Sequence, residues 1–169
     1  MANDREWIVA AARRYERPLL AYVRRMLGDP HRGQDVVQDA FLQLCKQSRA
    51  EVEPRLAPWL FAVCRRRVVD ILRKENRMAS LSADPPSAAN GPPEILEHKD
   101  TTQAVLARLA RLPANQQEAV RLKFLQQFSY REIAEVMGLS ESHVGVLLHL
   151  AMKSLRQSFA DSLKTAGGI

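Results

Sequence analysis

Apolar residues recur about every 3.6 positions over most of the chain, which is the period of an amphipathic α-helix. Three such runs lie within the first 78 residues. The first is expected to end at Gly28-Asp29-Pro30, the second to begin after Gly33, and the third to begin at Pro58, after a polar loop over residues 48–57. Strand-like alternation is absent from the sequence, so the pattern predicts an all-α fold.

Residues 79–97 interrupt this periodicity. They contain four prolines, one glycine and mainly small polar side chains, which neither sustain a helix nor fill a core. We interpret this stretch as a flexible, proline-rich linker. The predicted organisation is therefore two small helical domains, residues 1–78 and residues 98–169.

The second predicted domain has the sequence signature of a helix-turn-helix. Ser129 and Glu132 have the spacing of a capping box, and Ser140 is expected to cap the helix that follows. Gly138 permits a sharp turn between the two helices, and Val144 is expected to fill the corner where they cross. Two further helices are predicted before this unit, with core positions at Val105, Leu106, Leu109, Leu112, Ala119, Val120 and Phe124. These residue types at this spacing favour DNA binding.

Charge and composition narrow the function further. The net charge is +6 and the first predicted domain is the more basic, with 16 basic and 10 acidic residues, which favours a polyanionic partner. No run approaches the roughly 18 apolar residues of a membrane helix, and the first residues do not resemble a signal peptide. We therefore expect a cytoplasmic protein without membrane insertion.

The potential catalytic and metal-binding residues are sparse. Cys45 and Cys64 stand alone within apolar helical patterns, which predicts two buried thiols. Asp35 and Asp39 are one helical turn apart, but neither a histidine nor a third carboxylate accompanies them at ligand spacing. The sequence therefore predicts no enzymatic activity, no metal or other cofactor, and no small-molecule substrate.

Two helix faces in the first predicted domain are candidate interaction surfaces. The second helix has a narrow apolar stripe made of Val36, Val37, Ala40, Phe41, Leu44 and Cys45, which leaves a polar outer face around Asp35 and Gln38. The third helix carries Arg66, Arg73 and Arg77 opposite its apolar residues. These arginines span about 16 Å at about 1.5 Å rise per residue, comparable with several phosphate spacings. An arginine stripe is also common on a solvated face, so solvent and nucleic acid both stay open.

The order of these motifs resembles that of bacterial RNA polymerase sigma factors of the extracytoplasmic-function (ECF) group. The resemblance rests on three segments: YERPLLAYVRRMLGDPHRGQDVVQDAFLQL from Tyr15, PWLFAVCRRRVVDILRK from Pro58, and LPANQQEAVRLKFLQQFSYREIAEVMGLS from Leu112. It implies a first domain that binds core RNA polymerase and melts the start-proximal promoter element. It also implies a second domain that reads the distal element and touches the polymerase flap.

The resemblance also assigns residues to these tasks. Core-polymerase binding is implied for Asp35, Val37, Gln38, Asp39 and Phe41. The family's promoter-melting helix matches Trp59, Leu60, Arg65, Asp70, Leu72 and Arg73. Together, the resemblance and the arginine stripe give the expected contacts to the start-proximal element. These are Trp59, Arg65, Arg66, Arg73 and Arg77.

Two parts of the chain depart from the family's pattern. Arg66 stands where the family commonly has asparagine, which predicts an electrostatic contact there. In the recognition helix, Gly145, Leu147, Leu150 and Met152 replace the usual lysines and arginines. We expect Leu147 and Leu150 to pack against protein, Ser142 and His143 to contact base edges, and Arg131 and Lys153 to hold phosphates. The expected set of distal-element contacts is Arg131, Ser140, Ser142, His143 and Lys153.

The implied partners are core RNA polymerase and promoter DNA, and the sequence leaves open whether an anti-sigma factor also binds. Two other functions stay open. One is a helix-turn-helix transcriptional regulator that binds duplex DNA without being a polymerase subunit. The other is an adaptor that binds a protein through the apolar Leu147 and Leu150. The polar second helix followed by an arginine stripe favours the sigma factor over both.

Overall fold

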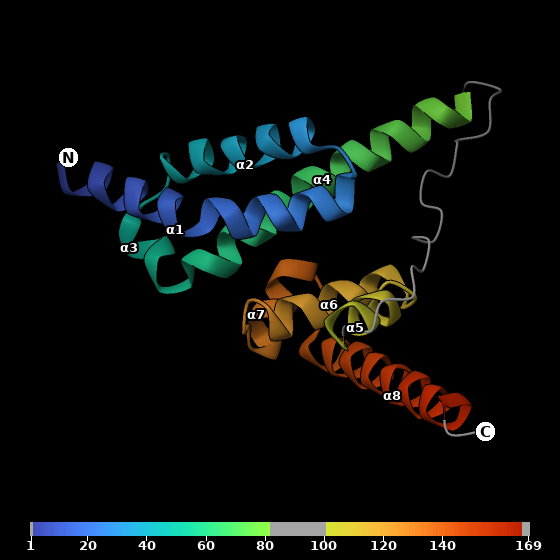
Figure 1. Cartoon of the computed structure of the whole chain (residues 1–169). Coiled ribbons are helices and arrows are strands. Elements are labelled where there is room, and N and C mark those ends of the chain that lie inside the picture. Colours follow the sequence, from blue (N-terminus) through green and yellow to red (C-terminus); the bar gives the residue numbers. More distant parts are fainter. Residues whose placement is uncertain (1, 82–100, 167–169) are drawn as a thin grey trace. The chain divides into compact units, whose positions relative to one another are not determined.

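The computed structural model describes residues 2–81 and 101–166, and within these ranges all regular structure is helical, which confirms the all-α prediction (Figure 1). The helices are α1 (Ala2–Leu27), α2 (Pro30–Leu44), α3 (Arg49–Val52), the 3-10 helix η1 (Glu53–Arg55), α4 (Leu56–Leu81), α5 (Thr101–Leu109), α6 (Ala114–Phe124), α7 (Tyr130–Met137) and α8 (Glu141–Ala166). They divide into two compact units, the first built from α1 to α4 and the second from α5, α6, most of α7, and α8. None of the described helices is long and apolar enough to cross a membrane.

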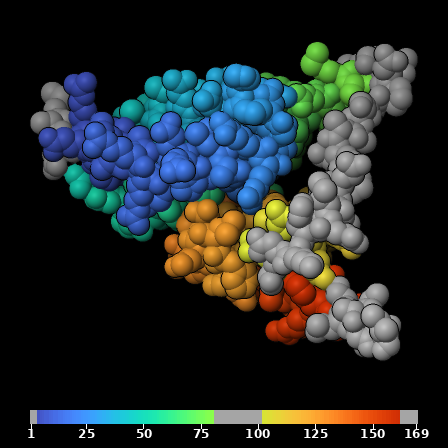
Figure 2. Space-filling view, in the orientation of Figure 1, coloured from blue at the N-terminus to red at the C-terminus, as the bar shows by residue number. Residues whose placement is uncertain are grey.

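The first unit is held together by three helices, α1, α2 and α4, each of which packs against the other two (Figure 1). In the space-filling view, α1 and α2 form one continuous surface (Figure 2). The rings of Tyr22 and Phe61 join α1 to α4, with centroids 5.0 Å apart and tilted planes. The buried core is made of Leu19, Val23, Val36, Val37, Ala40, Leu44, Val52, Leu60, Phe61, Cys64 and Val68. Each large side chain buried here contributes about 1.5–3 kcal/mol relative to exposure.

The prediction that α2 begins after Gly33 is wrong, because the helix begins at Pro30. Gly28 ends α1 with φ +72° and donates its N–H to the Arg24 carbonyl oxygen at 2.8 Å. Asp29 then caps α2 by accepting the N–H of His31 at Oδ1, 2.8 Å away. An aspartate followed by proline is a strong start signal, so the same three residues end one helix and begin the next.

Gly33 lies inside α2 and has a packing role. A Cβ added at this buried position would lie 3.1 Å from Cγ of Arg24 and 3.7 Å from Cγ1 of Val23. Contacts of 3.1 Å are tighter than ordinary van der Waals packing. The missing side chain therefore permits the close approach of α1 and α2.

The predicted boundaries of the third helix are also wrong. Residues 48–57, predicted as a loop, contain α3 and η1, and α4 begins at Leu56, before Pro58. Arg49 stabilises the short helix by donating to both carboxylate oxygens of Glu53, at 3.0 and 2.8 Å. At its other end α4 continues to Leu81, into the predicted linker, because Ala79 and Leu81 are good helix formers. Residues 82–97 of that linker lie outside the described residues.

The second unit packs α5 and α6 against α8. Its buried residues are Leu109, Leu112, Ala119, Val120, Leu122, Phe128, Ile133, Ala134, Val144, Leu147, Leu148 and Ala151. Three residues predicted as core are instead exposed: Val105 (39%), Leu106 (50%) and Phe124 (58%). Leu122 is the buried residue near the end of α6, and Phe124 is two positions later, about 200° around the helix. Helix α5 ends at Leu109, before the predicted stop at Pro113.

The two cysteines differ, contrary to the prediction that both are buried. Cys45 is exposed at the C-cap of α2, where the chain leaves the core. Cys64 is fully buried in the first unit, and desolvation of the charged form raises the pKa of its thiol to about 12. The thiolate is the reactive form, so Cys64 is expected to be unreactive in the folded protein.

We expect a thiol-specific reagent at about pH 8 to modify one cysteine rapidly in the native protein and two after denaturation. Burial and the raised pKa both keep Cys64 protonated and inaccessible, whereas Cys45 is exposed. Cys45→Ser should remove the rapid reaction, and Cys64→Ser is the matched control that should retain it. Rapid modification of both cysteines in the native protein would contradict this assignment.

Candidate nucleic-acid interface

The outer face of α2 presents part of the set predicted to bind core polymerase. Asp35 and Gln38 are exposed, and Asp39 is partly exposed. The carboxylate oxygen Oδ2 of Asp39 lies 3.5 Å from Nε of Arg67 on α4. This interhelical ion pair was missed in the sequence, because residues 28 positions apart carry no local pattern that relates them. The ion pair therefore links the exposed polar face of α2 to α4.

The other two residues of that predicted set lie on the inner side of α2. Val37 is 2% exposed within the core, and Phe41 is half-buried. A side chain as deeply buried as Val37 holds the helix in place. Of the predicted set, the polar members therefore lie on the outer face of α2, where Leu42 is also exposed.

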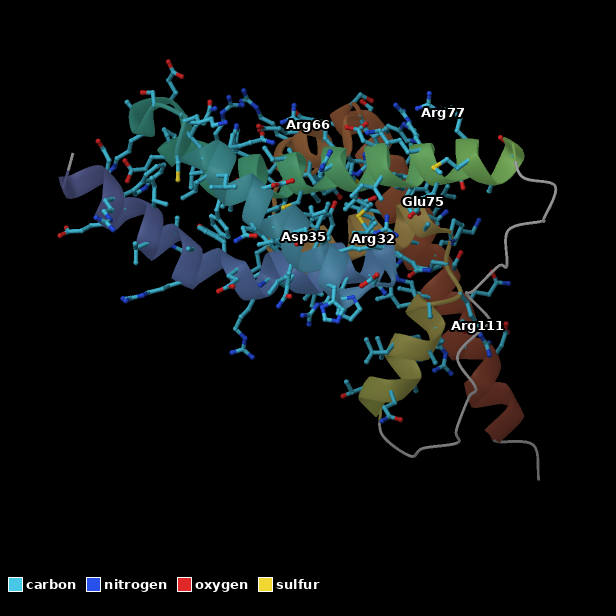
Figure 3. All side chains as sticks on the ribbon, turned by 90° about the horizontal axis from the view of Figure 1, so that it is seen from above. Arg32, Asp35, Arg66, Glu75, Arg77 and Arg111 are labelled. Atoms are coloured by element: carbon cyan, nitrogen blue, oxygen red, sulfur yellow. The ribbon has the colours of Figure 1, made fainter. Side chains whose placement is uncertain are left out.

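The arginine stripe on α4 is exposed, as its spacing predicts. Figure 3 shows Arg66 and Arg77 on one side of α4, away from the Arg32–Glu75 ion pair that joins α2 to α4. Arg73 is also exposed, and the spacing of seven and four residues places it on the same face. Among the described residues, no ion pair engages any of these three arginines.

Trp59 and Arg65, the other residues predicted to contact the start-proximal element, are less accessible. Trp59 is half-buried in the first turn of α4, and Arg65 is half-buried one position before the stripe begins. All five predicted residues lie on α4: Trp59, seven positions before Arg66, has the spacing of the arginine face, whereas Arg65 lies about 100° from it. The exposed part of the set is Arg66, Arg73 and Arg77.

The helix-turn-helix has the local geometry that its sequence predicts. The backbone N–H of Ser129 donates to Oε2 of Glu132 at 2.7 Å, and the N–H of Glu132 donates to Oγ of Ser129 at 3.2 Å, which completes the capping box. Gly138 has φ +66°, in the left-handed region that favours glycine. Oγ of Ser140 accepts the N–H of His143 at 3.2 Å, and Val144 is fully buried. The start of α8 is therefore held by a turn, a cap and a packed corner.

The buried and outward faces of α8 follow the same spacing. Val144, Leu148 and Ala151 are buried at positions i, i+4 and i+7. The same spacing moved back by two residues, about 200° around the helix, gives the outward face: Ser142, Val146 and His149, with Lys153 one turn later. All four of these side chains are exposed.

This outward face differs in part from the predicted DNA-contact set. Ser142 and Lys153 belong to both, whereas Val146 and His149 were not in the predicted set. Arg131, Ser140 and His143 are also exposed. Leu147 is buried as predicted, but Leu150 is 42% exposed, contrary to its predicted packing against protein.

A groove of about 390 Å³ runs along one flank of α8, lined by Lys123, Phe124, Tyr130, Gly145, Leu148, His149, Met152, Lys153 and Arg156. No acidic residue lines it. Nζ of Lys123 donates to the Phe128 carbonyl oxygen at 3.2 Å and lies 5.5 Å from the ring centroid of Tyr130, so its charge is held in place. Cationic side chains from both α8 and α6 therefore line this flank.

Comparison with known protein families matches each half of the chain separately. The family model for Sigma-70 region 2 matches residues 11–78, and the model for Sigma-70, region 4, matches residues 102–155. The chain belongs to the sigma-70 family. Region 2 takes in α2 and the arginine stripe of α4, and region 4 takes in the helix-turn-helix.

Relatives place this sigma factor in the ECF group. It is 25% identical over 147 residues to the ECF RNA polymerase sigma factor SigM of Bacillus subtilis, covering 84% of this chain and 88% of SigM. It is 27% identical over 144 residues to the ECF sigma factor SigL of Mycobacterium tuberculosis, covering 82% and 80% of the two chains. Its fold is similar to that of the sigma factor RpoE of Bartonella quintana, solved with the anti-sigma factor NepR, with a TM-score of 0.63 at 20% identity over 95% of this chain and 98% of RpoE.

These findings decide between the functions that the sequence left open. A sigma factor directs promoter-specific initiation of transcription, and its partners are core RNA polymerase and promoter DNA. A helix-turn-helix regulator that acts outside the polymerase is not favoured. Sigma factors as a class are non-enzymatic subunits of RNA polymerase.

Proposed function

We propose that α2 of this sigma factor binds core RNA polymerase, that the arginine face of α4 holds the start-proximal promoter element, and that α8 reads the distal element. Polymerase and promoter meet in the cytoplasm, where we place the protein. The observation that carries the proposal is the exposure of separate faces on these three helices, one polar, one cationic and one in a helix-turn-helix. The chemistry of transcription belongs to the polymerase, and this chain contributes binding and positioning.

For core binding, the proposed contact set is Asp35, Gln38 and Asp39, with Val37 and Phe41 acting through the packing of α2. The three polar side chains point away from the core, and two of them are carboxylates. Such a face is complementary to a basic surface on the polymerase. The Asp39–Arg67 ion pair favours one orientation of the Asp39 carboxylate before the partner arrives.

We expect the double variant Gln38→Ala, Asp39→Arg to abolish copurification with core polymerase while leaving the helical content unchanged. Both side chains lie outside the core, and reversing one charge opposes binding to a basic partner. Arg67→Ala is the matched control, because it removes the same exposed ion pair, which contributes at most about 1 kcal/mol, without altering α2. Unchanged copurification of the double variant would contradict the assignment of α2.

For promoter melting, Arg66, Arg73 and Arg77 are proposed to contact backbone phosphates of the start-proximal element. Their guanidinium groups are exposed on one face and have no ion-pair partner among the described residues. Trp59 and Arg65 are proposed to act from half-buried positions earlier in α4. Phosphate contacts hold the separated strand in register without reading its sequence.

Changing Arg66, Arg73 and Arg77 together to glutamine should lower open-complex formation, measured by permanganate reactivity of unpaired thymines, more than it lowers core binding. The salt dependence of promoter binding should become shallower by about 2 to 3 in the slope of log affinity against log salt. The matched control removes three exposed arginines from α1, at Arg13, Arg17 and Arg25. Equal losses of melting and core binding in the α4 variant would refute this separation of roles.

For the distal element, Ser142 and His143 are proposed to contact base edges while Arg131 and Lys153 hold phosphates. Ser140 is proposed to act at the same place by capping α8 and orienting its first turn.

An anti-sigma factor is the remaining proposed partner, because RpoE, which shares the fold, was solved bound to one. We expect such an anti-sigma factor to form a tight complex with this chain, and this complex should not bind core polymerase in size-exclusion chromatography. An anti-sigma factor that binds the chain while core polymerase stays bound would contradict the expectation.

A further inference from the structure

The outward face of α8 presents apolar surface at a position where a DNA-reading helix needs specificity. Val146 is 54% exposed at its centre, and Leu150 is 42% exposed at its edge. Neither side chain is needed for the core, which is filled from the opposite face by Val144, Leu148 and Ala151. The helix therefore exposes about half of each of two branched aliphatic side chains on or beside its outward face.

The neighbours of these side chains indicate what covers them. Ser142 and His149 lie one turn to either side of Val146 on the same stripe, and Lys153 ends it. The groove along the flank adds Lys123 and contains no acidic residue. A purely apolar protein surface would leave these polar and cationic groups unpaired, whereas the major groove of DNA has phosphate walls and polar base edges.

Thymine carries the largest apolar group on any base edge in the major groove. This is its C5 methyl group, whereas the other bases present hydrogen-bond donors, acceptors and small C–H groups there. A valine pressed against a donor or acceptor would remove its water without replacing the hydrogen bond, which carries a free-energy penalty. Opposite thymine, the same valine gains favourable apolar contact.

We propose that Val146, with Leu150 beside it, reads the methyl group of thymine in the distal promoter element. The proposal rests on the proposed function, in which α8 enters the major groove. Val146 and Leu150 are four positions apart, which is about 6 Å along the helix at about 1.5 Å per residue. That is close to two base steps of about 3.4 Å each, so the two side chains can reach one or two neighbouring thymines.

The direct test removes the methyl group from the DNA and leaves the protein unchanged. Full-length chain is assembled with core RNA polymerase, and duplex promoters are selected from a library with a randomised distal element. Each thymine of the selected element is then replaced by deoxyuridine, which differs only in lacking the C5 methyl group. We expect affinity to fall about fourfold at one or two positions and to stay unchanged at the others.

Two variants connect the effect to the side chain. Val146→Ala should bind the thymine and deoxyuridine promoters equally at those positions, with unchanged helical content because the residue is mostly exposed. Val105→Ala is the matched control, since it shortens another exposed valine of the second unit and should keep the preference for thymine.

Several results would overturn the proposal. The first is a selection that yields distal elements without thymine. The second is equal affinity for the thymine and deoxyuridine promoters at every position. The third is a Val146→Ala variant that still prefers thymine to deoxyuridine. In each case promoter-specific binding itself would survive, so the proposed function of α8 would stand. If the holoenzyme instead bound no promoter selectively, the proposed function would fail and this inference with it.

Discussion

Burial of one face on each long helix is the constraint that decides which side chains this sigma factor offers its partners. Helices α4 and α8 have 26 residues each, and their apolar faces form much of the two cores. In α4 the burial of Cys64 and Val68 turns the arginine stripe outward, and in α8 the burial of Val144 and Leu148 turns Val146 outward. The faces left for interaction are therefore those opposite the buried apolar faces of the same helices.

Predictions from the sequence succeeded where one local signal dominated. The 3.6-residue period is repeated over many turns, so the presence of helices and most of their buried faces could be predicted from the sequence. The capping box of Ser129 could be predicted because it is a short-range pattern. Several errors lie at helix ends, where burial depends on what neighbouring helices cover: Cys45 and Phe124 follow the apolar pattern yet are exposed. The Asp39–Arg67 ion pair could not be predicted from the sequence, because only tertiary packing brings these two residues together.

The two units differ in the source of their proposed binding energy. The first has most of the excess positive charge and exposes three arginines on α4, which suits contact with phosphates on a separated strand. The second has few cations on its recognition helix, where shape and apolar contact replace the bidentate hydrogen bonds of arginine to guanine. In the proposed function, attachment of α2 to the polymerase compensates for the few contacts that α8 makes, since linked contacts raise the effective local concentration.

The central claim is that this chain gives core RNA polymerase its promoter specificity, and run-off transcription tests it most directly. Core polymerase is incubated with promoter templates selected by the holoenzyme, with and without the full-length chain, and transcript length and amount are measured. We predict a discrete transcript from a fixed start site that requires the chain and is lost with the Gln38→Ala, Asp39→Arg variant. The same transcripts with and without the chain would contradict the account.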